Sequence, residues 1–179
     1  MAQWGRCEYK QLLKLKENID KLQSADMEKF CRDVSKELAA RLLGLVIPRT
    51  PVGVYKNRTY TCVTGYQHKG HNIEGKNGGT LRRGWTAKTQ AEAESGGGKS
   101  NAKAYANSLP VFKRGTKYYI EVINPVEYAS YVEFGHRTVN GGWASGHYFL
   151  TLSEHDLERL APRIIERRLR EMLQDVFKV

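Results

Sequence analysis

The chain has 179 residues, and its three scattered cysteines and lack of any apolar run near ~20 residues argue against a secreted disulfide framework and a membrane span. Its formal net charge of +10 permits attraction to nucleic acid, an acidic membrane face or an acidic protein, but the basic residues are spread along the chain rather than gathered among aromatic ones. Since a chain of this length can bury roughly 70% of its unfolded surface, we expect one soluble domain, residues 1–179, made in the cytoplasm.

Two amphipathic helices are predicted at the start of the chain. Apolar residues recur at helical spacing from Tyr9 to Leu22, which predicts a helical extension over residues 1–23. Ser24 can cap a second helix, which a long apolar stripe continues to about Leu45. The two prolines of IPRTPVG are expected to end it.

The middle of the chain predicts short strands and flexible loops. YKNRTYTCVTGYQ is rich in β-branched and aromatic residues and predicts a strand or hairpin, followed by a mobile loop over His68–Gly79. We interpret TLRRGWTAKTQAEAE as a strand that leads into a second flexible stretch, with a loop at Ser95–Asn101. LPVFKRGTKYYIEVIN predicts an antiparallel hairpin that turns at Gly115.

A short capped helix is predicted after this hairpin. Asn124 suits the N-cap, Pro125 the first helical position, and Glu127 the third, where it completes a capping box. Gly135 is expected to end the helix in a left-handed conformation.

The side chains of this predicted helix divide between packing and polar contacts. Tyr128 and Tyr131 lie on one face together with Val132, and we expect them to be mostly core. Glu133 stands at the negative end of the helix, where a carboxylate needs a cation or a donor, and Arg137 is one candidate partner.

The remainder of the chain predicts a third loop and a long final helix. Val139–Gly146 is glycine-rich, and Tyr148–Leu152 is interpreted as a short strand. Ser153 is expected to cap the final helix, and Pro162 to break or kink it. These elements predict an α+β fold in which the long N-terminal and C-terminal helices pack on a small antiparallel sheet, with long flexible loops.

Three motifs could carry chemistry, and each lacks a required part. AESGGGKS ends like a phosphate-binding loop, but Ala93 replaces a required glycine and no buried strand precedes it. Zinc would need paired ligands at tight spacing, which the candidates lack apart from one histidine pair. Those candidates are Cys62, His68, His71, His136 and His147.

An acid and base pair could be formed by Glu133 with His136 or His147, beside Arg137 as an anion clamp. However, no nucleophile elbow or paired acidic metal ligands accompany these residues. We therefore expect no catalytic, cofactor or metal site, and no enzymatic activity.

Four segments carry a resemblance to a known family. IPRTPVG, GGTLRRGW, VINPVEYASYVEFGHRT and GHYFLTLSEHDLERLAPRIIERRL, in this order, resemble the tail-completion or neck proteins of tailed bacteriophages, the gene-product-ten family. The resemblance covers about Met27–Phe177 and is most specific at Tyr128–Gly135. Residues 53–80 have no counterpart in the family pattern, which indicates an insertion in a core over residues 24–179.

The resemblance implies a structural virion protein of the neck, which completes the head-proximal end of the tail and joins it to the head. Its expected partners are further copies of itself in a hexameric or dodecameric ring, a head-completion or adaptor protein, a tail terminator or tail tube protein, and DNA in the ring lumen, but no membrane. The alternative is a basic nucleic-acid-binding protein. The residues expected to serve structure or interfaces are Tyr128, Tyr131, Glu133, Gly135, Arg137, Leu81, Arg82 and Trp85.

Overall fold

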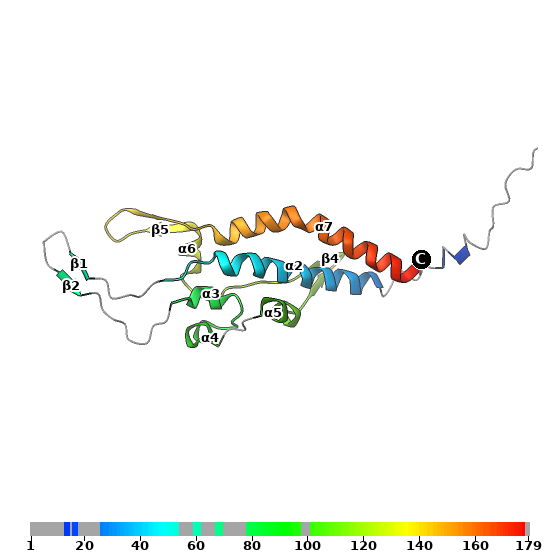
Figure 1. Cartoon of the computed structure of the whole chain (residues 1–179), viewed down its shortest axis with the longest axis horizontal. Helices are drawn as coiled ribbons and strands as arrows, with labels where there is room; N and C mark the ends of the chain where they lie inside the picture. Colours follow the sequence, from blue (N-terminus) through cyan, green and yellow to red (C-terminus); the bar gives the residue numbers. More distant parts are fainter. Residues whose placement is uncertain are drawn as a thin grey trace, which may run out of the picture.

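The computed structural model describes residues 13–14, 16–17, 26–53, 59–61, 67–69, 78–97 and 101–177. Two long helices, α2 and α7, lie side by side, and the short helices α3 to α5 lie on the other side of α2 (Figure 1). The elements in chain order are α2 (Met27–Arg49), β1 (Thr59–Thr61), β2 (Gln67–Lys69), α3 (Thr80–Gly84), α4 (Gln90–Ser95), α5 (Ala102–Ser108), β3 (Phe112–Arg114), β4 (Lys117–Tyr119), α6 (Ala129–Phe134), β5 (Gly135–Arg137), β6 (Trp143–Ser145) and α7 (Phe149–Phe177).

The predicted α+β class is confirmed, with helices towards both ends of the chain and small antiparallel sheets. The strands are divided among three two-stranded ladders, β1–β2, β3–β4 and β5–β6, and each ladder is antiparallel. The hairpin predicted around Gly115 is therefore confirmed. Of the strand or hairpin predicted over YKNRTYTCVTGYQ, the structure has the hairpin, but its second strand includes His68 and Lys69, which were predicted to begin the following loop. The predicted loop at Val139–Gly146 is corrected to a hairpin turn, because β6 occupies Trp143–Ser145.

The predicted helix at Tyr9–Leu22 lies largely outside the described residues, as does the predicted cap Ser24 and most of the loop His68–Gly79. Leu13, Lys14, Lys16 and Glu17 are helical.

Helix α2 continues past its predicted end at Leu45 and contains Pro48. A proline in the last turn removes only one backbone hydrogen bond, and hydrogen bonds from Thr50 stabilise the end of the helix. The backbone nitrogen of Thr50 donates to the Val46 carbonyl at 2.9 Å, and the Thr50 hydroxyl donates to the same oxygen at 2.7 Å. Thr50 is extended, with ψ of 123°, as a residue before Pro51 should be. The second proline of the motif therefore ends the helix.

The strand predicted from TLRRGW is wrong, because these residues begin helix α3. Leu81 and Trp85 are both buried, and their spacing of four places them on one helical face. Gly84 fits the same packing, since a Cβ there would lie 2.2 Å from Asn124 Oδ1. In a segment as short as α3, the spacing of the apolar residues fits a helix and a strand about equally well.

Two further capped helices replace the predicted structure of the next residues. Helix α4 lies at the end of TLRRGWTAKTQAEAE, which was predicted as a strand, and helix α5 lies in the flexible stretch predicted after it. Thr89 caps α4 by accepting from the Glu92 backbone nitrogen at 3.2 Å. Asn101 caps α5 by accepting from the backbone nitrogens of Lys103 and Ala104. Thr89 and Asn101 are residue types that favour the N-cap position, but the glycines between them led to the prediction of a flexible stretch instead of helices.

Helix α7 begins at Phe149, so the strand predicted at Tyr148–Leu152 is wrong. Ser153 lies inside the first turns, fully buried, and its hydroxyl donates to the Phe149 carbonyl at 2.6 Å rather than capping the helix. Pro162 was predicted to break or kink this helix, and the break is wrong, because α7 continues through Pro162 to Phe177. Pro162 is exposed, so water can bond the carbonyl that the proline leaves without a donor.

Ion pairs join α2 to α7 in antiparallel orientation. Arg49, at the end of α2, pairs with Asp156 near the start of α7. Glu37, further towards the start of α2, pairs with Arg167 and Arg168. The hydrophobic core lies between α2, the short helices and the first turn of α7. Its buried members are Ala39, Leu43, Val46, Leu81, Trp85, Ala87, Ala93, Tyr105, Ala106, Val126 and Phe149.

Candidate functional site

Three sequence motifs meet at the C-terminal end of α2. Trp85 Nε1 donates to the Thr50 hydroxyl at 2.8 Å, and the Trp85 ring meets the Phe149 ring edge-on with centroids 6.1 Å apart. Arg82 donates from Nε and Nη2 to the Thr50 carbonyl, at 3.1 and 2.7 Å. The segments IPRTPVG, GGTLRRGW and the start of α7 therefore form one internal joint, which contains the predicted site residues Leu81, Arg82 and Trp85.

A second predicted residue, Glu133, caps helix α7 from outside that helix. Its side chain is 4% exposed, and its carboxylate accepts from the backbone nitrogens of Leu150 and Thr151, each at 2.9 Å. The Thr151 hydroxyl donates to Glu133 Oε1 at 2.7 Å. The residue before the helix, Tyr148, has no oxygen placed to take this role, and its φ is +50°. A carboxylate at the positive end of a helix dipole is stabilising, and this one locks α6 to α7.

This geometry corrects the predicted partner of Glu133. The donors are the first turn of α7, and Arg137 is exposed on strand β5. The carboxylate is unfavourable at the end of its own helix, but the start of another helix compensates for it.

Two segments of the backbone, one at Gly135 and one at Gly146, approach each other closely where α6 is followed by β5. Gly135 has φ of +87° and ψ of 171°, and a Cβ there would lie 2.4 Å from the Ala144 carbonyl oxygen. A Cβ on Gly146, the residue that follows β6, would lie 2.2 Å from the Glu133 carbonyl oxygen. The need for positive φ at Gly135 is confirmed, but the residue is extended and begins β5 instead of forming a left-handed helix end.

The segment after Gly146 is fastened to α6 by backbone bonds. The His147 nitrogen donates to the Val132 carbonyl at 2.9 Å, and the Tyr148 nitrogen donates to the Glu133 carbonyl at 3.0 Å. The hairpin β5–β6 therefore leaves from and returns to a rigid base.

Helix α6 starts later than predicted, at Ala129 instead of Pro125. Asn124 accepts from the Val126 nitrogen at 3.2 Å, but its amide also donates to the Leu81 carbonyl at 2.9 Å. Asn124 therefore ties this segment to α3, and the helix forms only after the chain has turned away from that contact.

The predicted burial of the two tyrosines is wrong. Tyr128 is 41% exposed and Tyr131 58% exposed, and Tyr131 meets the His136 ring edge-on at 5.9 Å. The six-residue helix α6 packs instead through the buried Glu133 and the half-buried Val132.

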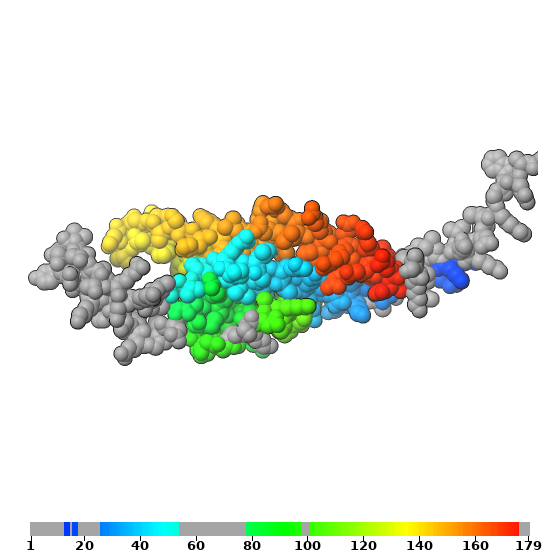
Figure 2. All heavy atoms as spheres, in the orientation of Figure 1, coloured from blue at the N-terminus to red at the C-terminus, as the bar shows by residue number. Residues whose placement is uncertain are grey.

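Exposed apolar side chains gather around α6, the hairpin β5–β6 and the first turn of α7, and we call this surface the aromatic corner. Trp143 is 65% exposed and Val139 fully exposed, and the hairpin that carries them projects from one end of the molecule (Figures 1 and 2). Large apolar side chains that are exposed on adjoining elements are candidates for an interaction site. The aromatic corner consists of Tyr128, Tyr131, Phe134, Val139, Trp143, Tyr148 and Leu152.

The acid and base arrangement considered from the sequence is not assembled as a reactive site. Both oxygens of Glu133 are occupied by the start of α7, and His136 contacts Tyr131 on the exposed side. Within the described residues, no group of three or more histidine, cysteine or acidic side chains could hold a metal ion. Cys62 and His71 lie outside the described residues.

Gly96 and Gly97 of AESGGGKS directly follow helix α4, and helix α5 begins further along the chain, at Ala102. Gly96 has φ of +84° and its nitrogen donates to the Glu92 carbonyl, which closes the C-terminal end of α4. A phosphate-binding loop follows a buried strand, whereas this glycine run follows a helix, so the arrangement differs from that motif.

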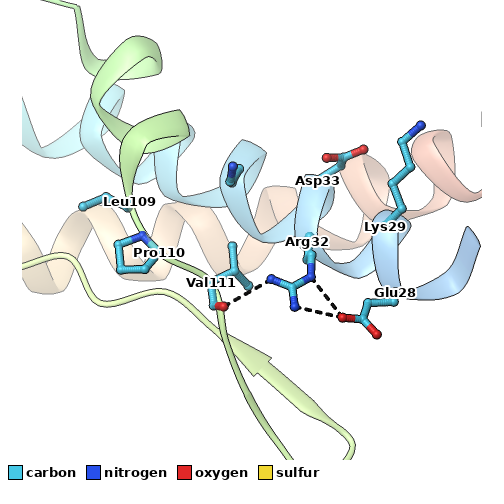
Figure 3. Close-up of a pocket in the computed structure, with 8 residues that line it drawn as sticks. Glu28, Lys29, Arg32, Asp33, Leu109, Pro110 and Val111 are labelled. Atoms are coloured by element: carbon cyan, nitrogen blue, oxygen red, sulfur yellow. Dashed lines mark hydrogen bonds and ion pairs between the residues drawn. The ribbon is translucent and has the colours of Figure 1, made fainter. Parts of the chain in front are cut away.

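An open groove between the start of α2 and residues 109–111 was not predicted from the sequence (Figure 3). Arg32 crosses it, donating to Glu28 Oε1 at 3.2 and 2.8 Å and to the Val111 carbonyl at 3.4 Å. Hydrogen bonds from Arg32 and Lys113 lower the pKa of Glu28, so this carboxylate stays ionised. The groove is also lined by Lys29, Asp33, Lys36, Leu109 and Pro110.

Comparison with protein families matched the chain to the family described as "Bacteriophage HK97-gp10, putative tail-component", over residues 14–135. The matched region spans more than half of the chain and ends at the glycine that begins β5. No curated protein and no solved structure matched. None of the helices in the described part of the chain is long and apolar enough to cross a membrane.

Proposed function

Because the chain belongs to the HK97-gp10-like family of bacteriophage tail components, we propose that it completes the head-proximal end of the tail and joins it to the head. A tail component is a structural protein of the virion. The proposed role is non-catalytic, because Glu133, the buried carboxylate of the acid and base pair considered from the sequence, serves as a helix cap.

The observation that carries this proposal is the aromatic corner on its rigid base. An exposed surface becomes a specific interface when large aromatic anchors are held in place before binding, because less ordering entropy is then lost. Here the Glu133 cap and the crossing at Gly135 and Gly146 fix the base of the hairpin. The corner therefore has both the composition and the support that an assembly surface needs.

We propose that the aromatic corner contacts the next copy of the chain in a closed ring. A head-to-tail contact between identical subunits closes into a ring when the rotation between neighbours divides a full turn. A hexamer or a dodecamer would match the symmetry expected of a neck. The proposed neighbours are a head-completion or adaptor protein on one face and a tail terminator or tail tube protein on the other.

Changing the aromatic corner should weaken self-assembly without unfolding the chain. Tyr131→Ser combined with Trp143→Ser removes two exposed anchors, and truncating such anchors raises a dissociation constant by at least about tenfold. Size-exclusion chromatography with light scattering, over a series of protein concentrations, should show the variant dissociating where the parent remains assembled. Thermal unfolding of the variant monomer should be unchanged within a few degrees.

The matched control replaces two exposed apolar residues outside the corner, Leu160→Ser with Ile165→Ser, which are 42% and 38% exposed. The control should assemble like the parent. An unaltered oligomer in the corner variant, or equal dissociation in the control, would contradict the assignment of this surface. A parent chain that stays monomeric at all concentrations would contradict it as well.

A further inference from the structure

The hairpin β3–β4 presents two faces of different character. Its register pairs Phe112 with Tyr119, and Arg114 with Lys117. Since side chains alternate along a strand and directly opposite residues share a face, these four side chains lie on one face. Lys113 and its partner Tyr118 lie on the other.

The Lys113 face anchors the hairpin to α2. Lys113 Nζ lies 3.4 Å from Glu28 Oε2 and 5.4 Å from the centre of the Tyr118 ring. Glu28 is also bound by Arg32, which in turn donates to the carbonyl of Val111, the residue that precedes β3 (Figure 3). The hairpin is thus held in a fixed orientation by the helix beneath it.

The opposite face keeps two like charges beside each other. Arg114 stands directly across from Lys117, an arrangement that destabilises an antiparallel pair unless an anion lies between the cations. Neither cation forms an ion pair with an acid in the described part of the chain, and both are exposed. The fold therefore gains nothing from this pair of charges.

Two exposed aromatic rings lie on the same face. Phe112 and Tyr119 are 40% and 41% exposed, and their rings stack with centroids 5.4 Å apart and an angle of 25° between planes. Flat aromatic side chains next to basic residues are the combination that single-stranded nucleic acids bind, with bases on the rings and phosphates on the cations. An acidic protein surface would need the cations but has no equivalent use for the stacked rings.

We propose that this face of β3–β4 binds nucleic acid, with Arg114 and Lys117 contacting phosphates and the Phe112 and Tyr119 rings contacting bases or sugars. The site lies on elements other than the aromatic corner, so it goes beyond the proposed structural role and can be tested separately from it.

Removing the facing cations should weaken binding and reduce its salt dependence. Fluorescence anisotropy with a labelled 20-base-pair duplex would compare the full chain with Arg114→Gln combined with Lys117→Gln. Each lost phosphate contact lowers the slope of log affinity against log salt by about 0.9, so the slope should fall by about 1.8. We expect the affinity at low salt to fall at least tenfold.

The charge-matched control is Lys88→Gln with Arg163→Gln, which removes two exposed cations outside the hairpin β3–β4. It should change affinity less than about threefold, because it removes the same charge but no local contact. Equal losses in the two double variants would overturn the proposal in favour of diffuse attraction by net charge, and so would a parent chain that does not bind DNA. The oligomeric state should be the same in all these proteins, which separates this result from a failure of the ring proposal.

Single-stranded and double-stranded sources of phosphate are distinguished by the aromatic pair. Phe112→Leu with Tyr119→Leu keeps the apolar character of the face but removes base stacking. If unstacked bases are the ligand, the affinity for an oligothymidine should fall several-fold. The affinity for the duplex should then fall by less than twofold. Loss of affinity for neither form would overturn the role of the rings. Polyglutamate that binds the parent as tightly as DNA, at equal charge concentration, would overturn the nucleic-acid assignment and indicate an acidic protein surface.

Discussion

Replacing Gly135 with valine should destabilise the fold by more than the usual cost of a surface substitution. The backbone of Gly135, at φ of +87° and ψ of 171°, is in a region that essentially only glycine adopts, and holding another residue there costs about 1–3 kcal/mol. The new Cβ would also lie 2.4 Å from the Ala144 carbonyl oxygen and 2.8 Å from the Gly146 nitrogen. Both neighbours are backbone atoms of the hairpin, so relief would require β5 and β6 to separate. Urea unfolding followed by circular dichroism measures the loss.

Gly141 in the same hairpin provides the matched control for this experiment. It also has positive φ, +81°, but a Cβ there would have no neighbour within 4 Å. Gly141→Val should therefore lose only the conformational part, about 1–2 kcal/mol. If Gly135→Val is no less stable than Gly141→Val, the close crossing of the two backbones is not a determinant of the fold.

Replacing Trp85 with alanine should produce the largest loss of stability from a core side chain. Trp85 is 3% exposed, contacts Phe149, and donates to Thr50, so alanine would leave a large cavity and remove a buried hydrogen bond. Large aromatic to alanine changes in a core cost about 3–5 kcal/mol. The variant should unfold at clearly lower urea concentration than the parent, with a loss of the cooperative near-ultraviolet signal.

Trp143→Ala is the natural comparison, because it deletes the same side chain from a position that is 65% exposed. Its effect on the unfolding free energy of the monomer should remain within about 0.5 kcal/mol. Similar losses for the two tryptophans would mean that the joint between α2, α3 and α7 does not hold the core together.

Helices and strands whose apolar residues form a long or strongly alternating pattern could be predicted from the sequence. The stripe from Met27 to Leu45 repeats often enough to identify α2, and the glycine turn between aromatic strands identifies β3–β4. The α+β class follows from these elements. The short helix α3 could not be predicted, because five residues fit either period and the deciding contact, between Gly84 and Asn124, joins distant parts of the chain.

The capping of α7 shows a second limit of local patterns. Ser153 is a good N-cap residue by type, but Glu133 supplies the cap from another helix, so α7 can begin at Phe149. The signal that remained in the sequence is the repeated Gly-His pair, at Gly135 and at Gly146, where the two backbones approach each other. A single sequence does not reveal that these two dipeptides are neighbours.

Two residues of the aromatic corner, Tyr128 and Tyr131, were interface candidates from the sequence, but their exposure was not predicted. Tyr131 stands at a position that an amphipathic helix would bury, yet α6 is short and buries Glu133 instead. Trp143 and Val139 were assigned to a loop, and the hairpin that presents them depends on pairing between β5 and β6. Leu81, Arg82 and Trp85, by contrast, were identified as structural candidates only through the family resemblance, and their contacts lie within the chain.

Electron microscopy of a lysate from a phage that lacks this gene tests the proposed neck role most directly. Capsids and tails are built separately, and only their end rings must meet, so a protein that completes the tail is needed after both have formed. We expect filled heads and tails that are both present but unjoined, with joined particles restored by the intact gene and not by the Tyr131→Ser, Trp143→Ser copy. Normal joined particles from the deletion, or heads that remain empty, would contradict the account.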